Sequence, residues 1–108
     1  MTIQTTPLFS AVTATGAQAS VDFIPKGEKN FVAFGLTTAG SGAAKVRVEG
    51  STGNGQWVFV GDIDITLAAT AAASVPDGFS VQGSFPLWRG NVVSITGTGA
   101  AVNLNVVL

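Results

Sequence analysis

The clearest structural signal in the chain is the run Val46-Arg47-Val48-Glu49-Gly50-Ser51-Thr52-Gly53-Asn54-Gly55-Gln56-Trp57-Val58-Phe59-Val60. Its first part alternates valines with charged residues, as a β-strand does when one face is buried and the other is solvated. The Asn54-Gly55 pair then tolerates the positive φ angles of a tight turn between antiparallel strands. Alternation resumes after this turn. The segment therefore predicts an antiparallel β-hairpin.

The same period-two alternation recurs on both sides of the hairpin, whereas helical periodicity does not. One strong run places Phe31 and Ala33 on one face of a strand. It places Val32, Phe34 and Leu36 on the other face. The predicted strands cover residues 11–15, 20–24, 30–38, 44–51, 56–60, 63–67, 79–81, 87–96 and 102–108.

Because 56–60 and 63–67 can form one strand broken by a bulge or bend at Gly61-Asp62, and some runs are weak, we expect seven or eight strands. Short strands separated by turns predict an all-β fold, either an antiparallel β-sandwich or a jelly roll. Residues 1–10 contain Pro7 and show no period, so they are predicted to form an extended N-terminal arm. Residues 11–108 are then a single sandwich domain.

The composition is unusual because charged residues make up only 10% of the chain, while 46% of the residues are hydrophobic. An ordinary soluble domain has about 25% charged residues. The surface must therefore be built largely from small uncharged side chains. We interpret it as a surface that other protein chains cover. The alternative is a free domain with a coat of Thr, Ser and Asn.

Several functional classes are disfavoured by what the chain lacks. It has no Cys and no His, which removes thiolate metal sites, disulfides and the usual hydrolase triad. A serine–lysine dyad would need a buried lysine, and the three lysines are expected in a loop or on a polar strand face. We therefore expect no enzymatic activity, no catalytic residue, no cofactor and no metal.

Nucleic acid and membrane are not expected partners either. The five basic residues are too few and too scattered for a nucleic-acid footprint; they are Lys26, Lys29, Lys45, Arg47 and Arg89. No apolar run has the ~18 residues needed to cross a bilayer. The N-terminus also lacks a basic region followed by an apolar segment, so no signal peptide is expected.

Asp62 and Asp64 are the most suggestive carboxylates. They are two residues apart on one predicted strand, so their side chains share a face about 6–7 Å apart. Such a pair could serve a glycosidase or, with Asp22 or Asp77, bind calcium. No cluster of substrate-binding aromatic residues or calcium-loop motif accompanies it. We interpret the two as solvated carboxylates on an exposed face.

Five residues are predicted to contact a partner protein. Trp57 and Phe59 alternate with Val58 and Val60, which look like core positions, so the two aromatic rings share the outer face. Such rings indicate a subunit interface, a second buried layer or a sugar-binding platform. Arg89 is predicted either to pair with a carboxylate or backbone carbonyl, or to anchor an interface. The full set of expected contact residues is Phe9, Trp57, Phe59, Trp88 and Arg89.

Two segments resemble motifs of small structural proteins of tailed bacteriophages. The hairpin from Val46 to Trp57 is similar to a recurring V-x-V-E-G-S-x-D-G-x-W motif, with Asn54 where Asp is common. The segment from Leu87 to Ala100 is similar to a W-R-x-N-V-x-S-I-T-G-T-G ending, with Gly90 where Ala is common. The two segments follow each other in the same order and at a similar spacing as in that family.

The resemblance implies a virion protein, with the capsid, the neck and the tail as its possible positions. We expect a non-enzymatic capsid decoration (cement) protein that forms a homo-oligomer, with a trimer as one option. Its further partner would be the major capsid protein or another virion protein. The alternative is a carbohydrate-binding β-sandwich module of a tail or baseplate, suggested by the two tryptophans and the Asp62/Asp64 pair.

Overall fold

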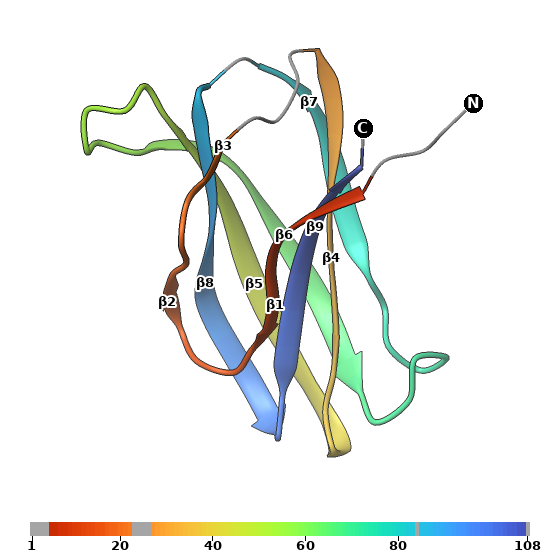
Figure 1. Ribbon diagram of the computed structural model, residues 1–108. Coiled ribbons are helices and arrows are strands. Elements are labelled where there is room, and N and C mark those ends of the chain that lie inside the picture. Colours follow the sequence, from red (N-terminus) through yellow and green to blue (C-terminus); the bar gives the residue numbers. More distant parts are fainter. Residues whose placement is uncertain (1–4, 23–26, 84, 108) are drawn as a thin grey trace.

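The computed structural model describes residues 5–22, 27–83 and 85–107, which form two antiparallel sheets packed face to face (Figure 1). This confirms the predicted all-β sandwich. The strands are β1 (Thr5–Val12), β2 (Gly16–Ala17), β3 (Val21–Asp22), β4 (Glu28–Leu36), β5 (Ala39–Ser51), β6 (Val58–Ala68), β7 (Asp77–Gln82), β8 (Leu87–Thr98) and β9 (Ala101–Val107). None of the described elements is an apolar helix long enough to cross a membrane.

The strand order is that of a jelly roll. One sheet has the order β1-β9-β4-β7 and the other the order β2-β8-β5-β6, with β3 also paired to β8. If β2 and β3 are taken as one interrupted strand, eight strands fill two four-stranded sheets. With β2 and β3 counted as one strand, successive strands change sheet at every connection except between β5 and β6. Among the described strands, β5 and β6 are therefore the one pair of sequence neighbours that form a hairpin within a sheet.

The predicted hairpin is present, but its turn is wider than expected. β5 and β6 pair from Ser41↔Ala68 to Gly50↔Val58, and the loop between them projects beyond the end of the sandwich (Figure 1). Gly53 and Gly55 in this loop have φ angles of 97° and 82°, which glycine adopts readily. The pairing shifts where β6 has one extra residue, Val60. The predicted bulge near Gly61 is thus confirmed.

The N-terminal segment is not a free arm in its described part. From Thr5 to Val12 it forms β1 and pairs with β9, and residues 1–4 lie outside the described residues. The pairing shifts twice along β1, so the adjacent Leu8 and Phe9 are both buried. Because the pairing is irregular, the side chains of β1 do not alternate between buried and exposed, and alternation in the sequence could not reveal this strand. It also ends at Val12, so the predicted strand 11–15 is wrong.

The core lies between the two sheets and is centred on aromatic rings. The Trp88 ring lies 5.3 Å from that of Phe31 and 5.4 Å from that of Phe85, measured between centroids. Trp88 is only 1% exposed and Phe9 only 7%. The expectation that these two residues contact a partner is therefore corrected, because both are already covered by their own chain.

Lys29 is a second correction, because its side chain is fully buried on the inner side of β4. Its ammonium donates to the carbonyl oxygens of Gly27 (2.8 Å) and Gly83 (2.6 Å) and lies 5.3 Å from the centre of the Trp88 ring. Burial lowers the pKa of Lys29. Because both hydrogen bonds go to backbone carbonyls, this lysine ties together two loops.

Candidate functional site

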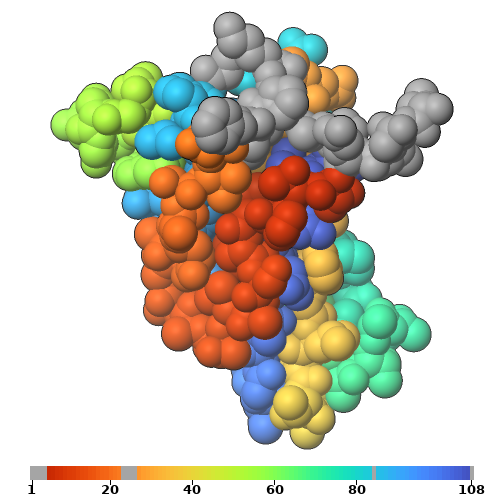
Figure 2. Space-filling view, viewed as in Figure 1, coloured from red at the N-terminus to blue at the C-terminus, as the bar shows by residue number. Residues whose placement is uncertain are grey.

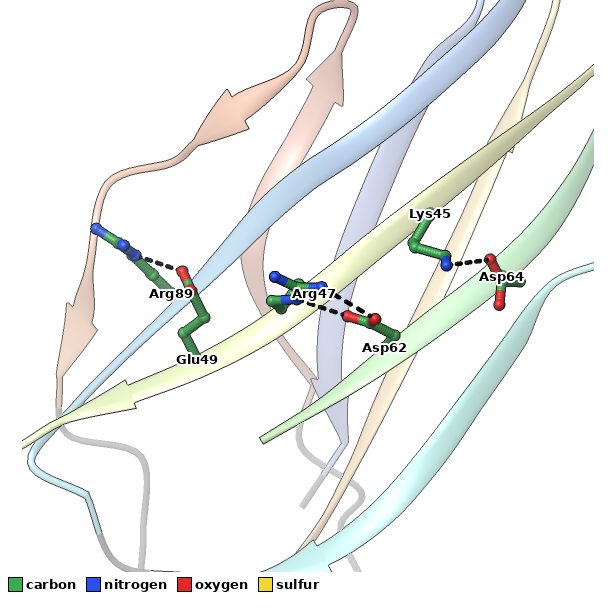
Figure 3. Close-up of polar contacts among 6 residues, drawn as sticks. All are labelled: Lys45, Arg47, Glu49, Asp62, Asp64 and Arg89. Carbon is green, nitrogen blue, oxygen red and sulfur yellow. Dashed lines mark hydrogen bonds and ion pairs between the residues drawn. The ribbon is translucent and has the colours of Figure 1, made fainter. Parts of the chain in front are cut away.

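The outer face of the β2-β8-β5-β6 sheet carries a row of three ion pairs (Figure 3). Alternation along β5 directs Lys45, Arg47 and Glu49 to this face. The register then places each beside an opposite charge on a neighbouring strand. The pairs are Lys45–Asp64 at 3.9 Å, Arg47–Asp62 at 2.9 Å and Arg89–Glu49 at 2.8 Å. Asp62 and Asp64 thus share a face as predicted, but each has a cationic partner.

The Arg47–Asp62 pair is bidentate. Nε of Arg47 donates to Oδ1 of Asp62 at 2.9 Å, and Nη2 donates to Oδ2 at 3.3 Å. This hydrogen bonding raises the pKa of Arg47 above its ordinary value. By contrast, the Lys45–Asp64 pair is longer and its side chains are 40% and 74% exposed, so it holds neither residue firmly.

The Arg89–Glu49 pair is the most enclosed of the three. The side chains are 23% and 12% exposed, and Nε of Arg89 donates to Oε1 of Glu49 at 2.8 Å. The predicted pairing of Arg89 with a carboxylate is therefore confirmed. In a partly desolvated position such a charge-assisted hydrogen bond is stronger than a neutral one. Arg89 is consequently held in a fixed orientation.

Each of the two arginines also lies over an aromatic ring. Cζ of Arg89 is 4.2 Å from the centre of the Trp57 ring, and Cζ of Arg47 is 5.2 Å from that of Phe59. Both distances are within the range of cation–π attraction. We call this group the arginine–aromatic patch; its members are Arg47, Glu49, Trp57, Phe59, Asp62 and Arg89.

The structure thus brings together three of the five predicted contact residues, Trp57, Phe59 and Arg89. Sequence reasoning missed Arg47 and Glu49 as members of the same group. The signal was available, because Arg47 and Glu49 are two positions apart on one strand, and alternation places such residues on the same face. What could not be seen was the register that brings β8 and β6 to either side of them.

Val58 and Val60 were expected in the core, and this expectation is wrong for Val58. Its side chain is 51% exposed, and Phe59 beside it is 56% exposed. Val60 is only half-buried. Val58 starts β6 next to the projecting loop and pairs with Gly50, so it lies on the inner side of the sheet and not on the side of the arginines. Phe59 pairs with Glu49, so its exposed ring is the apolar surface beside the guanidinium groups.

The opposite side of the sandwich is different in character. Along β4 the outward side chains after Asn30 are apolar, and Phe34 and Leu36 are 40% and 44% exposed, so the predicted facing of this strand is confirmed. On β9 the outward positions alternate with the buried ones and include Asn103 and Asn105. Figure 2 shows this side, where β1, β9 and β4 lie next to one another.

Among the described residues of β1, β9, β4 and β7, the exposed charged side chains are Glu28, at the start of β4, and Asp77, at the start of β7 and opposite Ala33. We call the part of this surface between them the uncharged face; its main members are Val32, Phe34, Leu36, Ala101, Asn103, Asn105 and Val107. Asn103 is already used within the chain, since it donates to the Phe34 carbonyl at 3.3 Å and accepts from the Ala11 N–H at 2.9 Å.

Metal binding has little support in the described parts of the chain. There, no three His, Cys, Asp or Glu side chains come together in a group that could hold a metal ion. Asp62, the carboxylate considered for calcium, has both oxygens engaged by Arg47. No protein-family profile matches this sequence, and no curated protein is significantly similar to it.

Proposed function

We propose that this chain is a non-enzymatic structural protein of a tailed-phage particle, a cement protein that associates with itself and with the capsid. The observation that carries the proposal is the uncharged face. The central part of this surface carries no charge, so no like charges come together there when two copies meet, and it can pair with itself. Burying its apolar side chains would stabilise association by about 25 cal/mol per Å² before the entropic cost is subtracted.

Two further observations support a role in a particle. The hairpin and the C-terminal segment resemble motifs of phage structural proteins, and both segments lie in the same sheet, as β5–β6 and β8. Jelly rolls also occur in viral capsid proteins, although the same fold serves lectins and cupins. The distribution of charge adds a physical reason, since six of the charged residues are paired with one another on one side.

The test is the oligomeric state of the purified chain by size-exclusion chromatography with light scattering. We expect a mass that is a multiple of the 10.8 kDa monomer. Phe34→Asp should shift the population toward monomer, because it places a charge in the uncharged face. The matched control is Thr66→Asp, which adds the same charge to an exposed position on β6. A clean monomer at high concentration would contradict the proposal.

Two contacts in the arginine–aromatic patch argue against the carbohydrate-binding alternative. A sugar platform needs an open aromatic face, and the guanidinium of Arg89 lies over one side of the Trp57 ring. Asp62 is also engaged by Arg47 rather than free to accept from sugar hydroxyls. Binding on a glycan array that Trp57→Ala abolishes would nevertheless favour this alternative.

A further inference from the structure

We infer that the arginine–aromatic patch is a docking site for an acidic segment of a partner protein, one that presents Asp or Glu side chains next to an apolar residue. The inference rests on the proposed function for the existence of a protein partner, and it adds the chemistry of the surface that this partner presents. It concerns the opposite side of the molecule from the uncharged face.

The first argument is an inventory of hydrogen-bonding groups. Each arginine has five N–H donors. Arg89 uses one on Glu49, and Arg47 uses two on Asp62. Within the described residues, seven N–H groups of these two arginines therefore have no protein acceptor. The acceptors of the patch are largely used, since both oxygens of Asp62 and one of Glu49 are engaged. The formal charges of the patch cancel, because each arginine is paired with a carboxylate, but its remaining hydrogen-bonding groups are mostly donors. A partner rich in acceptors would complement them.

Carboxylates complement these donors better than neutral acceptors do. The free edge of a guanidinium matches the two oxygens of a carboxylate, which gives two parallel charge-assisted hydrogen bonds. The hydrogen bond of Arg89 to Glu49 uses Nε alone, so both Nη groups of Arg89 have no acceptor among the described residues. Bidentate pairing to a second carboxylate is therefore open to Arg89 without loss of its first one.

The second argument is that the arginines are already ordered. Binding normally loses the rotamer entropy of a long side chain, about 0.5–1.5 kcal/mol for each. Here the ring of Trp57 and the carboxylate of Glu49 hold Arg89 from two sides. Phe59 and Asp62 hold Arg47 in the same way. Two prearranged guanidinium groups lose less on binding, and arginine and tryptophan are the side chains most often found at binding hot spots.

The third argument identifies the partner as protein. Phe59 is 56% exposed although the guanidinium of Arg47 lies near its ring, so the occupant must cover apolar surface as well as supply carboxylates. A peptide segment with an aromatic or aliphatic residue next to an acidic one does both. β6 is also the last strand in its sheet, and the described bridge to its edge, Thr66↔Val75, lies away from Phe59 and Asp62, so an extended segment can add to the edge near the patch.

The experiment is a titration of the full chain with two fluorescent nine-residue peptides, followed by anisotropy at low salt. One peptide is composed of Glu, Phe and Gly, and its twin has Gln in place of every Glu. We expect the Glu peptide to bind at least about tenfold more tightly than the Gln twin, and added salt to reduce the difference. Equal affinity for the two peptides, or no binding of either, overturns the inference.

Variants locate the binding. Arg89→Gln should weaken binding of the Glu peptide about tenfold or more, which corresponds to about 1.4 kcal/mol. This change leaves Glu49 without its partner. The double variant Glu49→Gln/Arg89→Gln replaces the ion pair by two neutral side chains and so avoids an unpaired charge. It should bind the Glu peptide as weakly as Arg89→Gln does. The matched control is Lys45→Gln, which removes a cation of the same face outside the patch and should change affinity less than twofold. If Lys45→Gln and Arg89→Gln weaken binding equally, the patch is not the site.

The result of the peptide titration can be distinguished from the result of the test of self-association. The Phe34→Asp variant should bind the Glu peptide as the wild type does, whatever its oligomeric state. A monomeric wild type that still binds through Arg89 would contradict self-association and leave the docking site intact. An oligomeric wild type with no preference for the Glu peptide would do the reverse.

Discussion

The ring of Phe9 lies against the backbone of Gly90, in the space that a side chain at position 90 would fill. Phe9 belongs to β1 in one sheet and Gly90 to β8 in the other, so this contact joins the two layers of the sandwich. A Cβ on Gly90 would overlap the Phe9 ring and would lie 2.8 Å from Cδ2 of Leu104. Position 90 is thus restricted to glycine as long as Phe9 is in place.

We therefore expect Gly90→Ala to lower the free energy of unfolding by about 1–3 kcal/mol, the usual cost of overpacking a core. The requirement for glycine comes from the ring of Phe9, which is the nearest group to the position of the added Cβ. Urea unfolding followed by tryptophan fluorescence measures the effect. In a Phe9→Leu background the same substitution should cost less, because the smaller side chain leaves room.

The control for this prediction is Gly83→Ala. A Cβ on Gly83 would be 3.6 Å from the nearest atom of Trp88, an ordinary contact, and the residue does not have a positive φ angle. Its substitution should change stability little. Equal losses for Gly90→Ala and Gly83→Ala would show that the Phe9 contact does not set the requirement at position 90.

Lys29 gives a second prediction, which concerns alkaline pH. Its buried ammonium has a pKa lowered from the ordinary 10.5 because burial disfavours the charge. Below the lowered pKa, Lys29 is protonated in both the folded and the unfolded chain. Between that pKa and 10.5 the unfolded chain holds more protons than the folded one. Stability should therefore rise with pH in this window and level off above it.

The measurement is the free energy of urea unfolding at a series of alkaline pH values, for the wild type and for Lys29→Met. The variant should lack the wild type's rise. The chain contains no Tyr or Cys, so only lysines and the N-terminal amine titrate near this range. Lys45→Met is the control, since Lys45 is partly exposed and its replacement should leave the rise intact. Parallel curves for the wild type and Lys29→Met would contradict the prediction.

The fold class followed from the sequence because the pleat of a strand repeats every two residues. Wherever alternation was regular, as along β4 and β5, the predicted facing of the side chains agrees with the structure. The hairpin was also found, since its turn residues and flanking strands are local in sequence. The strand order was not, because sheet changes between successive strands depend on contacts between distant segments.

The errors occur where local pattern and tertiary packing disagree. Lys29 follows the inward phase of β4 set by Phe31 and Ala33, yet its charge argued for an exposed position. What buries it is a pair of carbonyl acceptors from two loops that the sequence does not show to be adjacent. Phe9 was assigned to an arm because two shifts in the β1 pairing remove the alternation that marks a strand.

A third prediction concerns the end of β1, where the pairing with β9 is irregular. Ala11 has a φ angle of 51°, the left-handed conformation that costs an ordinary L-residue about 1–2 kcal/mol. Its N–H donates to Oδ1 of Asn103, a contact that holds this geometry in place. Ala11→Gly should therefore stabilise the chain by about 1 kcal/mol, since glycine adopts this conformation without strain.

Ala43→Gly is the control, because Ala43 is an exposed residue of β5 whose φ angle is not positive. This variant should lower the free energy of unfolding by about 0.5–1 kcal/mol instead. Urea unfolding distinguishes the two, and a loss of stability in Ala11→Gly comparable to that in Ala43→Gly would show that the left-handed backbone at Ala11 carries no strain to relieve.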